Sequence, residues 1–160
     1  MKRINDNRGL FVLSDSKKYD QIFLASNEAR HTFRGLHYQN NPQQIKHVSI
    51  IQGKVIDFLY HLRTGEVKTY ILTPSSEILT ISKEYAHGYL TLEPDTIVYY
   101  EVEGQYNPET YKSIVWDTIP SIKDKIIEVI GINNSDRITI SDKDKLMYLV
   151  QHLATNLSVL

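Results

Sequence analysis

Short apolar runs separated by turn residues fill most of the chain, and this pattern predicts β-strands. The stretch "KHVSIIQGKVIDFLYHLRTGEVKTYIL" has two β-branched apolar runs on either side of Gln52-Gly53 and a third run after Thr64-Gly65. Both dipeptides are typical hairpin turns. The runs "EILTIS", "GYLTLEPDTIVYYEV" and "YKSIVW" continue the pattern, with Pro94-Asp95 as a further turn. Strands that recur at this spacing predict an antiparallel sandwich or barrel.

The C-terminal end has a different period. The apolar residues that recur at helical spacing are Leu146, Leu149, Val150, Leu153 and Leu157. Ser141 is a suitable N-cap, and Asp144 follows three residues later as in a capping box. We therefore expect a helix over about 142–157. The segment 118–140, with "KIIEVIGI", fits either a strand or a short helix.

Size and composition narrow the class of protein. The 160 residues predict a single domain over 1–160. Lys plus Arg number 18 and Asp plus Glu 19, which argues against a nucleic-acid or polybasic membrane surface. The chain has no Cys, shows no signal-peptide pattern and has no apolar run of membrane-spanning length. We expect a cytoplasmic protein.

The segment "RGLHYQ" holds the first candidate for chemistry, His37. Its imidazole titrates near neutral pH and suits a general base, although a histidine in a barrel wall can equally be a structural residue with satisfied hydrogen bonds. In "YAHGY", His87 precedes Gly88, which permits a close backbone approach. His87 is either a ligand for an anion or a turn residue. Neither histidine has the neighbours of a metal site, so we expect no metal.

Other side chains have a structural and a chemical interpretation as well. Tyr99 and Tyr100 are adjacent in a strand, so one of them faces the interior as a general acid or as a core aromatic. Lys46 begins a strand; it is either solvated or points inward toward an anion. Asp144 either caps its helix or orients a histidine.

Several motifs occur together in a specific order. "FRGLHYQ", "QIK", "YAHGYL", "VYYEVEGQYNPE", "IVW" and "SDKD" follow one another along the chain. In this order, from "DNRGLF" at residue 6 to residue 144, the chain resembles the dTDP-4-dehydrorhamnose 3,5-epimerase family. The resemblance implies an all-β fold, a cupin-like antiparallel β-barrel (jelly roll) with a C-terminal helix. It also implies a nucleotide-sugar substrate, a homodimer and no cofactor.

The resemblance assigns roles to the residues that match the family's motifs. It implies that His37 is the catalytic base, that Asp144 pairs with it, that Tyr100 is the acid on the opposite face and that Lys46 lies near the sugar keto oxygen. Tyr99 would then point outward. Asp142 is the alternative partner of His37.

The resemblance also implies a set of substrate-binding residues: Arg34, His87, Tyr106, Gln39, Arg8 and Phe11. Of these, Arg8 and Phe11 match residues that reach the neighbouring subunit's site in the family. The chain departs from the family in "QIFLASNEARHTF", which has apolar residues in place of a Gln-x-Asn pair, and in "ISKEYAHG", which lacks a proline.

The implied reaction inverts a carbon beside a 4-keto group. The base removes a proton to leave an enolate, and an acid on the other face returns one. The expected activity is inversion of C3, C5 or both in a dTDP-linked 4-keto-6-deoxyhexose, in deoxysugar biosynthesis. The alternatives are a single-site 3- or 5-epimerase, a ketoisomerase on another nucleotide sugar, and a non-catalytic cupin that binds a sugar nucleotide.

Overall fold

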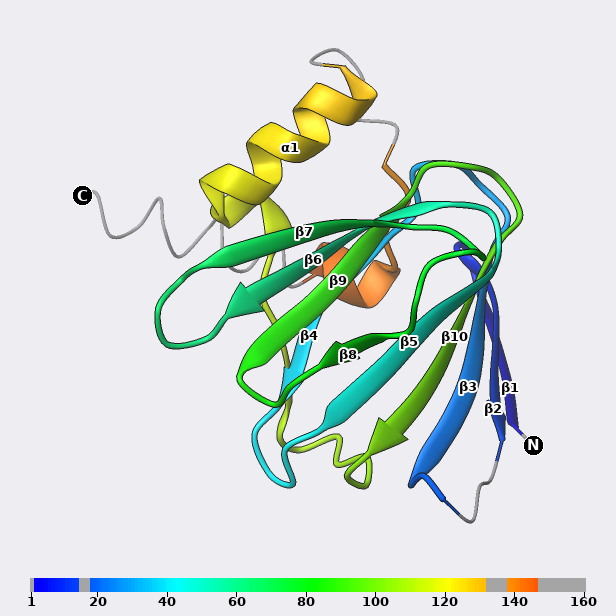
Figure 1. Cartoon of the computed structure of the whole chain (residues 1–160), viewed down its shortest axis with the longest axis vertical. Helices are drawn as coiled ribbons and strands as arrows, with labels where there is room; N and C mark the ends of the chain where they lie inside the picture. The colour runs from blue at the N-terminus through cyan, green and yellow to red at the C-terminus, as the bar shows by residue number, and fades with distance from the viewer. Residues whose placement is uncertain (1, 15–17, 132–137, 147–160) are drawn as a thin grey trace.

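The computed structural model describes residues 2–14, 18–131 and 138–146. Two antiparallel sheets face each other, and one helix lies against the outside (Figure 1). The strands are β1 (Lys2–Asp6), β2 (Gly9–Ser14), β3 (Gln21–Asn27), β4 (Phe33–Gln39), β5 (Ile45–Gln52), β6 (Val55–His61), β7 (Val67–Leu72), β8 (Leu79–Ile81), β9 (Tyr85–Thr91), β10 (Thr96–Glu103) and β11 (Tyr111–Ser113). A 3₁₀ turn, η1 (Trp116–Thr118), precedes helix α1 (Pro120–Ile130). The all-β prediction is confirmed.

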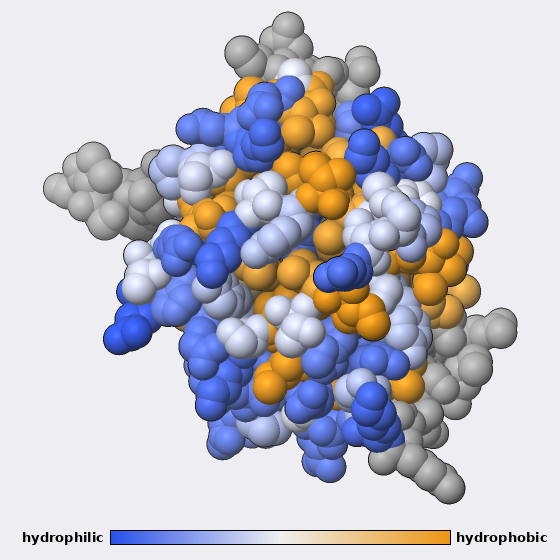
Figure 2. Space-filling model, in the orientation of Figure 1, coloured by the Kyte–Doolittle hydropathy of each residue, from blue (hydrophilic) through white to orange (hydrophobic). Residues whose placement is uncertain are grey.

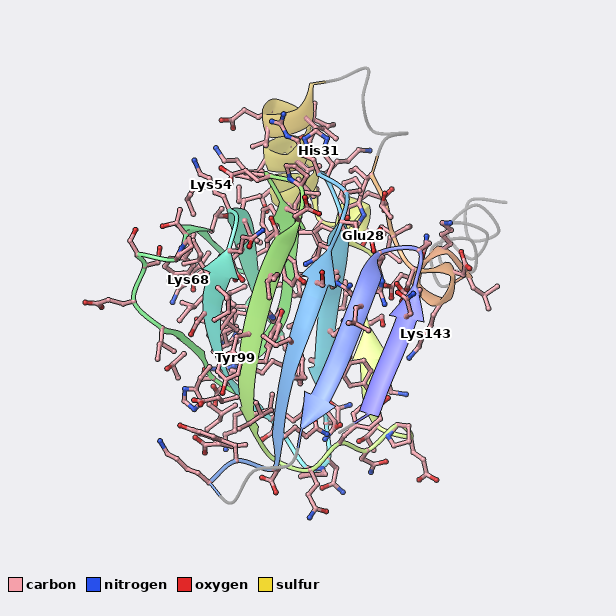
Figure 3. All side chains as sticks on the ribbon, turned by 90° about the vertical axis from the view of Figure 1, so that its right-hand side faces the viewer. Glu28, His31, Lys54, Lys68, Tyr99 and Lys143 are labelled. Carbon is pink, nitrogen blue, oxygen red and sulfur yellow. The ribbon has the colours of Figure 1, made fainter. Side chains whose placement is uncertain are left out.

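Each sheet draws strands from distant parts of the chain. The six-stranded sheet has the order β1-β2-β3-β10-β5-β8, and the five-stranded sheet has the order β11-β4-β9-β6-β7. Figure 3 shows β10, β3, β2 and β1 side by side, seen from outside the six-stranded sheet. The predicted hairpin at Thr64-Gly65 is confirmed, because β6 pairs with β7 across it.

The predicted hairpin at Gln52-Gly53 is wrong. At this turn the chain leaves the six-stranded sheet, where β5 lies, and enters the five-stranded sheet as β6. Gly53 has a φ of +81°, and a Cβ there would collide with the Thr96 side chain. Gln52 donates from Nε2 to the Asp95 carbonyl at 3.0 Å. The turn is therefore a corner, and it packs against the corner that leads from β9 to β10.

The apolar residues form two layers. One layer lies between the sheets and includes Val48, Val55, Leu59, Val98 and Tyr100. The other lies between the five-stranded sheet and α1, and it includes Phe33, Leu36, Ile56, Phe58, Ile122 and Ile126. Strand β6 serves both layers because successive side chains of a strand point to opposite faces.

Segment 118–140, which the sequence left open, contains a helix. Pro120 stands at its first turn, where a missing N–H costs nothing. Ile122, Ile126 and Ile130 follow at four-residue spacing and are buried on one side. Gly131, with a φ of +85°, ends the helix and donates its N–H to the Ile127 carbonyl at 2.8 Å.

The predicted C-terminal helix begins where the sequence indicates. The Asp144 N–H donates to Ser141 Oγ at 3.1 Å, and residues 142–146 are helical. The expected continuation from 147 to 157 lies outside the described residues. Within the described part of the chain, no helix is long and apolar enough to cross a membrane.

The surface mixes polar and apolar side chains. Figure 2 shows apolar patches among polar side chains on the face that Figure 1 presents. The large apolar residues that are at least half exposed include Ile51 of β5, Ile71 of β7, and Ile78 just before β8. They come from both sheets and the loop between them, so they do not mark one element as an interface.

Candidate active site

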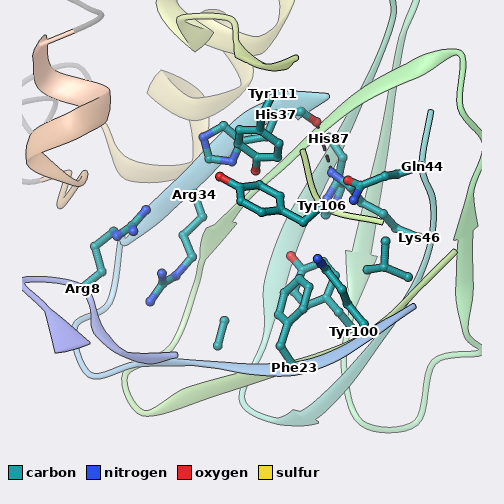
Figure 4. Close-up of a pocket in the computed structure, with 13 residues that line it drawn as sticks. Arg8, Phe23, Arg34, His37, Gln44, Lys46, His87, Tyr100, Tyr106 and Tyr111 are labelled. Carbon is teal, nitrogen blue, oxygen red and sulfur yellow. Dashed lines mark hydrogen bonds between the residues drawn. The ribbon is translucent and has the colours of Figure 1, made fainter. Parts of the chain in front are cut away.

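A cavity of about 190 Å³ opens between the two sheets (Figure 4). Strands of both sheets and the segment after β10 contribute its walls. The lining residues are Arg8, Gln21, Phe23, Ala25, Arg34, His37, Gln44, Lys46, His87, Tyr100, Val102, Tyr106 and Tyr111. Seven of the ten residues assigned to the site from the sequence and its resemblance are in this set: Arg8, Arg34, His37, Lys46, His87, Tyr100 and Tyr106.

A β-bulge places Arg34 and His37 on the same wall. Residues three apart in a regular strand point to opposite faces. Here Arg34 is opposite Tyr89 and His37 is opposite His87, so two residues of β4 face a single residue, Gly88, of β9. The extra residue shifts the alternation by one position, so the side chains of Arg34 and His37 point to the same face and both line the cavity.

Two glycines permit this bulge. Gly35 has a φ of +126°, and a Cβ there would overlap the Gly88 Cα atom. A Cβ at Gly88 would lie 2.9 Å from the Arg34 carbonyl oxygen. The backbones of β4 and β9 therefore approach more closely than any other residue type allows. This explains the glycines in "RGLH" and "AHG".

His37 pairs with Asp144, 107 residues later. Nε2 of His37 lies 3.1 Å from Oδ1 of Asp144, and the other carboxylate oxygen accepts a 2.7 Å hydrogen bond from Ser141 Oγ. Asp142 is exposed and bonds Lys145 instead. The hydroxyl of Ser141, which caps the last described helix, thus also holds the carboxylate that pairs with the imidazole.

The environment sets opposite charge preferences for the pair. Burial, with the charges of Lys46 and Arg8, lowers the pKa of His37 more than the hydrogen bond and charge of Asp144 raise it, so the imidazole is neutral at pH 7. Burial raises the pKa of Asp144, but hydrogen bonds from His37 and Ser141 and the charge of Arg8 outweigh this and leave the pKa below its usual value. A neutral imidazole beside an ionised carboxylate is the resting state of a general base.

Lys46 enters the cavity from the start of β5. Its Nζ donates to the backbone carbonyl of His37 at 3.2 Å, the dashed line in Figure 4. Burial lowers the pKa of Lys46 to about 8, and the charge of Asp57 opposes that effect. The ammonium group is therefore mostly protonated at pH 7 and able to stabilise an oxyanion.

Tyr100 faces the cavity, and Tyr99 faces outward. The Tyr100 ring stacks on Phe23, with centroids 4.5 Å apart, and meets the edge of His87 at 5.9 Å. Burial raises the pKa of Tyr100 well above its usual value, so the phenol keeps its proton. Tyr99 donates instead to Glu101 on its own strand at 3.0 Å, on the face seen in Figure 3.

The guanidinium of Arg34 is held by hydrogen bonds to two residues of β3. Its Nε donates to Asn27 Oδ1 at 2.7 Å, and Nη2 donates to the Ser26 carbonyl at 3.0 Å. Asn27 is fully buried and also bonds Tyr89. These contacts fix the guanidinium in the wall, where its charge faces the cavity.

Arg8 lines the cavity of its own chain, and its reach to a neighbouring subunit's site stays a prediction. Its Nε donates to Asp6 Oδ1 and its Nη2 to Asp6 Oδ2, and its Nη1 lies 3.4 Å from Asp144 Oδ2. The β1–β2 turn is short enough to keep Arg8 beside the last described helix. Phe11 lies in β2, and its side chain is outside the described part of the structure.

Gln39 does not reach the cavity. Its amide donates to the carbonyls of Pro42 and Gln105 at 2.6 and 2.8 Å, and its Oε1 accepts from the Asn107 N–H at 2.8 Å. Gln39 therefore holds together the loops that follow β4 and β10. Its position two residues after His37 fits a substrate contact, but closeness in the sequence does not reveal where a side chain forms its hydrogen bonds.

Several lining residues were missed by sequence reasoning. Tyr111 of β11 lies beside His37, with ring centroids 5.3 Å apart, and beside Tyr106 at 5.4 Å. Phe23 and Gln44 complete the walls next to Tyr100 and Lys46. The inward alternation of β3 could have identified Phe23, but only pairing with β10 shows that it meets Tyr100.

His87 is held by a carboxylate that sequence reasoning also missed. Its Nε2 lies 2.7 Å from Oδ2 of Asp57, and both side chains are buried. Each of the two histidines that line the cavity is thus paired with a carboxylate.

The two facing sheets and the cavity between them define a cupin-like protein with acid–base groups in its interior. Comparison with known proteins identifies the group within this class. The chain belongs to the dTDP-4-dehydrorhamnose 3,5-epimerase family, an isomerase family acting on carbohydrates, because the family's sequence model matches residues 1–152. The resemblance found in the motifs is confirmed.

Individual relatives agree with this assignment. The dTDP-4-dehydrorhamnose 3,5-epimerase of Methanothermobacter thermautotrophicus is 31% identical over 156 residues, covering 88% of this chain and 81% of the relative. The enzyme of the same name from Escherichia coli is 28% identical and covers 70% of each chain.

Solved structures are similar over most of their length. The Bacillus anthracis epimerase, solved with TDP and PPi bound, has a TM-score of 0.64 and 28% identity, covering 89% of this chain and 87% of that one. The Legionella pneumophila epimerase, in complex with dTDP-4-keto-L-rhamnose, has a TM-score of 0.65 and 26% identity, covering 91% and 82%. The predicted cupin-like fold is thereby confirmed.

Proposed function

We propose that this protein epimerises a dTDP-linked 4-keto-6-deoxyhexose at C3, C5 or both. The observation that carries the proposal is the neutral His37 imidazole, paired with Asp144, in one cavity with Lys46 and Tyr100. A 4-keto group acidifies the C–H bonds on both neighbouring carbons. His37 removes one of these protons and leaves an enolate.

Lys46 and Tyr100 complete the reaction. The Lys46 ammonium group stabilises the developing oxyanion, a role in which loss of one donor typically costs about 10²–10³ in rate. Tyr100, whose hydroxyl stays protonated, returns a proton from the other side of the sugar ring and so inverts the carbon. Arg34, Arg8 and His87 supply positive or hydrogen-bonding groups for the substrate and its diphosphate.

Solvent-proton exchange tests the proposal. The protein is incubated with dTDP-4-keto-6-deoxyglucose in D₂O, and NMR follows deuterium at each sugar carbon. Exchange at C3 and C5 is expected for the full epimerase, and exchange at one carbon identifies a single-site enzyme. Tight binding with no exchange at either carbon would refute the proposal and indicate a binding protein.

We propose in addition a homodimer that works in the cytoplasm. The family resemblance supports the dimer, because Arg8 and Phe11 match residues that reach the neighbouring subunit's site in the family. The lack of cysteine fits a reducing compartment. Light scattering after size-exclusion chromatography tests the dimer, with twice 18.5 kDa expected and a single 18.5 kDa species contradicting it.

A further inference from the structure

Tyr111 of β11 lines the cavity, and the proposed mechanism gives it no role. β11 pairs with β4 so that Ser113 is opposite His37 and Tyr111 is opposite Gln39. Opposite residues of an antiparallel pair point to the same face, and so do alternate residues of one strand. Tyr111 and His37 are therefore diagonal neighbours on the face of the five-stranded sheet that borders the cavity.

Three neighbours hold the ring of Tyr111. Its centroid lies 5.3 Å from that of His37 and 5.4 Å from that of Tyr106, and the pair with Tyr106 is edge-to-face. Lys143 Nζ lies over the ring, 5.4 Å from the centroid. In Figure 4, Tyr111 and His37 lie side by side, with Tyr106 next to them. Because aromatic and cation–π contacts of this kind are attractive, the ring has a fixed place in the wall before a ligand enters.

The hydroxyl of Tyr111 lacks a protein partner. Among the described residues, no hydrogen bond reaches it, although a phenol in a protein interior usually has a partner. In the same described part of the chain the Tyr100 hydroxyl is also without one, and its proposed partner is the substrate. Burial, together with the neighbouring Tyr106 and Asp144, raises the pKa of Tyr111. The hydroxyl therefore keeps its proton and can donate it in a hydrogen bond.

Tyr111 and Tyr100 stand on opposite sides of the cavity. Tyr100 belongs to β10 of the six-stranded sheet, whereas Tyr111 and His37 belong to the five-stranded sheet. A sugar ring bound between His37 and Tyr100 would present one side to each of them. Sugar oxygens on the His37 side would then face the Tyr111 phenol, a neutral donor beside the charged groups that suit the diphosphate and the keto oxygen.

We infer that Tyr111 is a substrate-binding residue, whose hydroxyl donates a hydrogen bond to a sugar oxygen on the same side as His37. The inference rests on the proposed function, because it requires a nucleotide-linked sugar between His37 and Tyr100. A contact made with the sugar alone lets the cavity bind a sugar nucleotide more tightly than the free nucleotide. Loss of one neutral hydrogen bond typically weakens binding by about 3–10-fold.

The Tyr111→Phe variant removes the hydroxyl and keeps the ring with its three neighbours. Isothermal titration calorimetry measures binding of dTDP-glucose, whose sugar has no keto group and is not turned over, and of dTDP, which has no sugar. We expect the variant to bind dTDP-glucose about 3–10-fold more weakly than the wild type and dTDP equally well. Tyr38→Phe is the matched control, because Tyr38 lies on the other face of β4 in the layer beneath α1 and should leave both affinities unchanged.

Three results would overturn the inference. Unchanged affinity of Tyr111→Phe for dTDP-glucose would show that the hydroxyl does not contact the sugar. Equal losses for dTDP-glucose and dTDP would assign the contact to the nucleotide. Failure of the wild type to bind dTDP-glucose would remove the sugar nucleotide on which the contact depends.

Binding is measured without turnover, so the results separate this inference from the proposed function. A selective loss of dTDP-glucose affinity, together with no deuterium exchange on dTDP-4-keto-6-deoxyglucose, would support the contact and refute the proposed function. Exchange by the wild type with unchanged affinities in Tyr111→Phe would do the reverse. In an active enzyme, Tyr111→Phe should raise KM and leave kcat close to the wild-type value, because His37, Lys46 and Tyr100 remain in place.

Discussion

His37 and Asp144 lie 3.1 Å apart, although 107 residues separate them in the chain. The first comes from a strand of the five-stranded sheet and the second from the first turn of the C-terminal helix. Ser141 holds the carboxylate through its own hydroxyl, so the helix cap and the proposed base share one hydrogen-bond network.

Replacing Asp144 with Asn should slow deuterium exchange by about 10²–10⁴-fold, because the imidazole loses the carboxylate that fixes its tautomer and orientation. The acid limb of the pH profile should also move to lower pH, because the carboxylate raises the pKa of His37. Asp142→Asn is the matched control and should exchange at the wild-type rate, since Asp142 bonds exposed Lys145. Equal effects of the two substitutions would contradict the assignment of Asp144.

The pH dependence of exchange should be bell-shaped. His37 acts as a base only when neutral, so the rate rises as pH increases through its pKa, which burial places below the ordinary 6.5. Lys46 acts only when protonated, so the rate falls as pH increases through about 8. Stopped-time NMR assays from pH 5 to 9 check this; a rate that still climbs above pH 9 would exclude Lys46⁺ as the oxyanion stabiliser.

Tyr100→Phe should separate proton removal from inversion. The base remains, so exchange at a sugar carbon continues, while inversion at one centre falls by about 10²-fold or more because the proton donor is gone. Tyr99→Phe removes a hydroxyl from the outer face and should change neither quantity. NMR of the product sugar measures both the deuterium exchange at each carbon and the fraction of inverted product. Full inversion in Tyr100→Phe would assign the acid to another group.

The bulge in β4 should be intolerant of substitution. Gly35→Ala forces a Cβ into Gly88 and a residue with a side chain into a φ of +126°, so we expect a loss of about 3 kcal/mol or more in the free energy of unfolding. Gly65→Ala also meets a positive φ, of +73°, but its Cβ would lie 3.7 Å from the nearest atom, and it should cost about 1–2 kcal/mol. Urea unfolding compares the two variants. Equal losses would mean that close packing at the bulge is unimportant.

Local patterns in the sequence predicted what depends on local physics. The alternation in "TIVYYEV" predicts that one of Tyr99 and Tyr100 faces inward, and the structure assigns that position to Tyr100. Ser141 and Asp144 form the predicted cap because their spacing alone brings the hydroxyl to the third N–H of the helix. The all-β fold class and the first residue of the last helix were likewise predicted from local residue patterns.

Relations between distant strands could not be predicted this way. A Gly at a turn looks the same whether the next strand pairs with the last or crosses to another sheet, so Gln52-Gly53 was mistaken for a hairpin. Asp57 in "VIDFLY" gives a signal, an acid at an inward position of an apolar strand, but its partner His87 is 30 residues away. The family resemblance identified His37 and Tyr100, whereas the structure showed that Tyr111 lies beside the first and Phe23 beside the second.

Deuterium exchange in His37→Gln tests the proposed mechanism most directly. Gln keeps a polar side chain of similar size and cannot remove a proton at neutral pH. With dTDP-4-keto-6-deoxyglucose in D₂O, the account predicts that exchange at both sugar carbons drops by about 10²–10⁴-fold while the sugar nucleotide still binds. Exchange at the wild-type rate in this variant would contradict it, because some other group would then be the base.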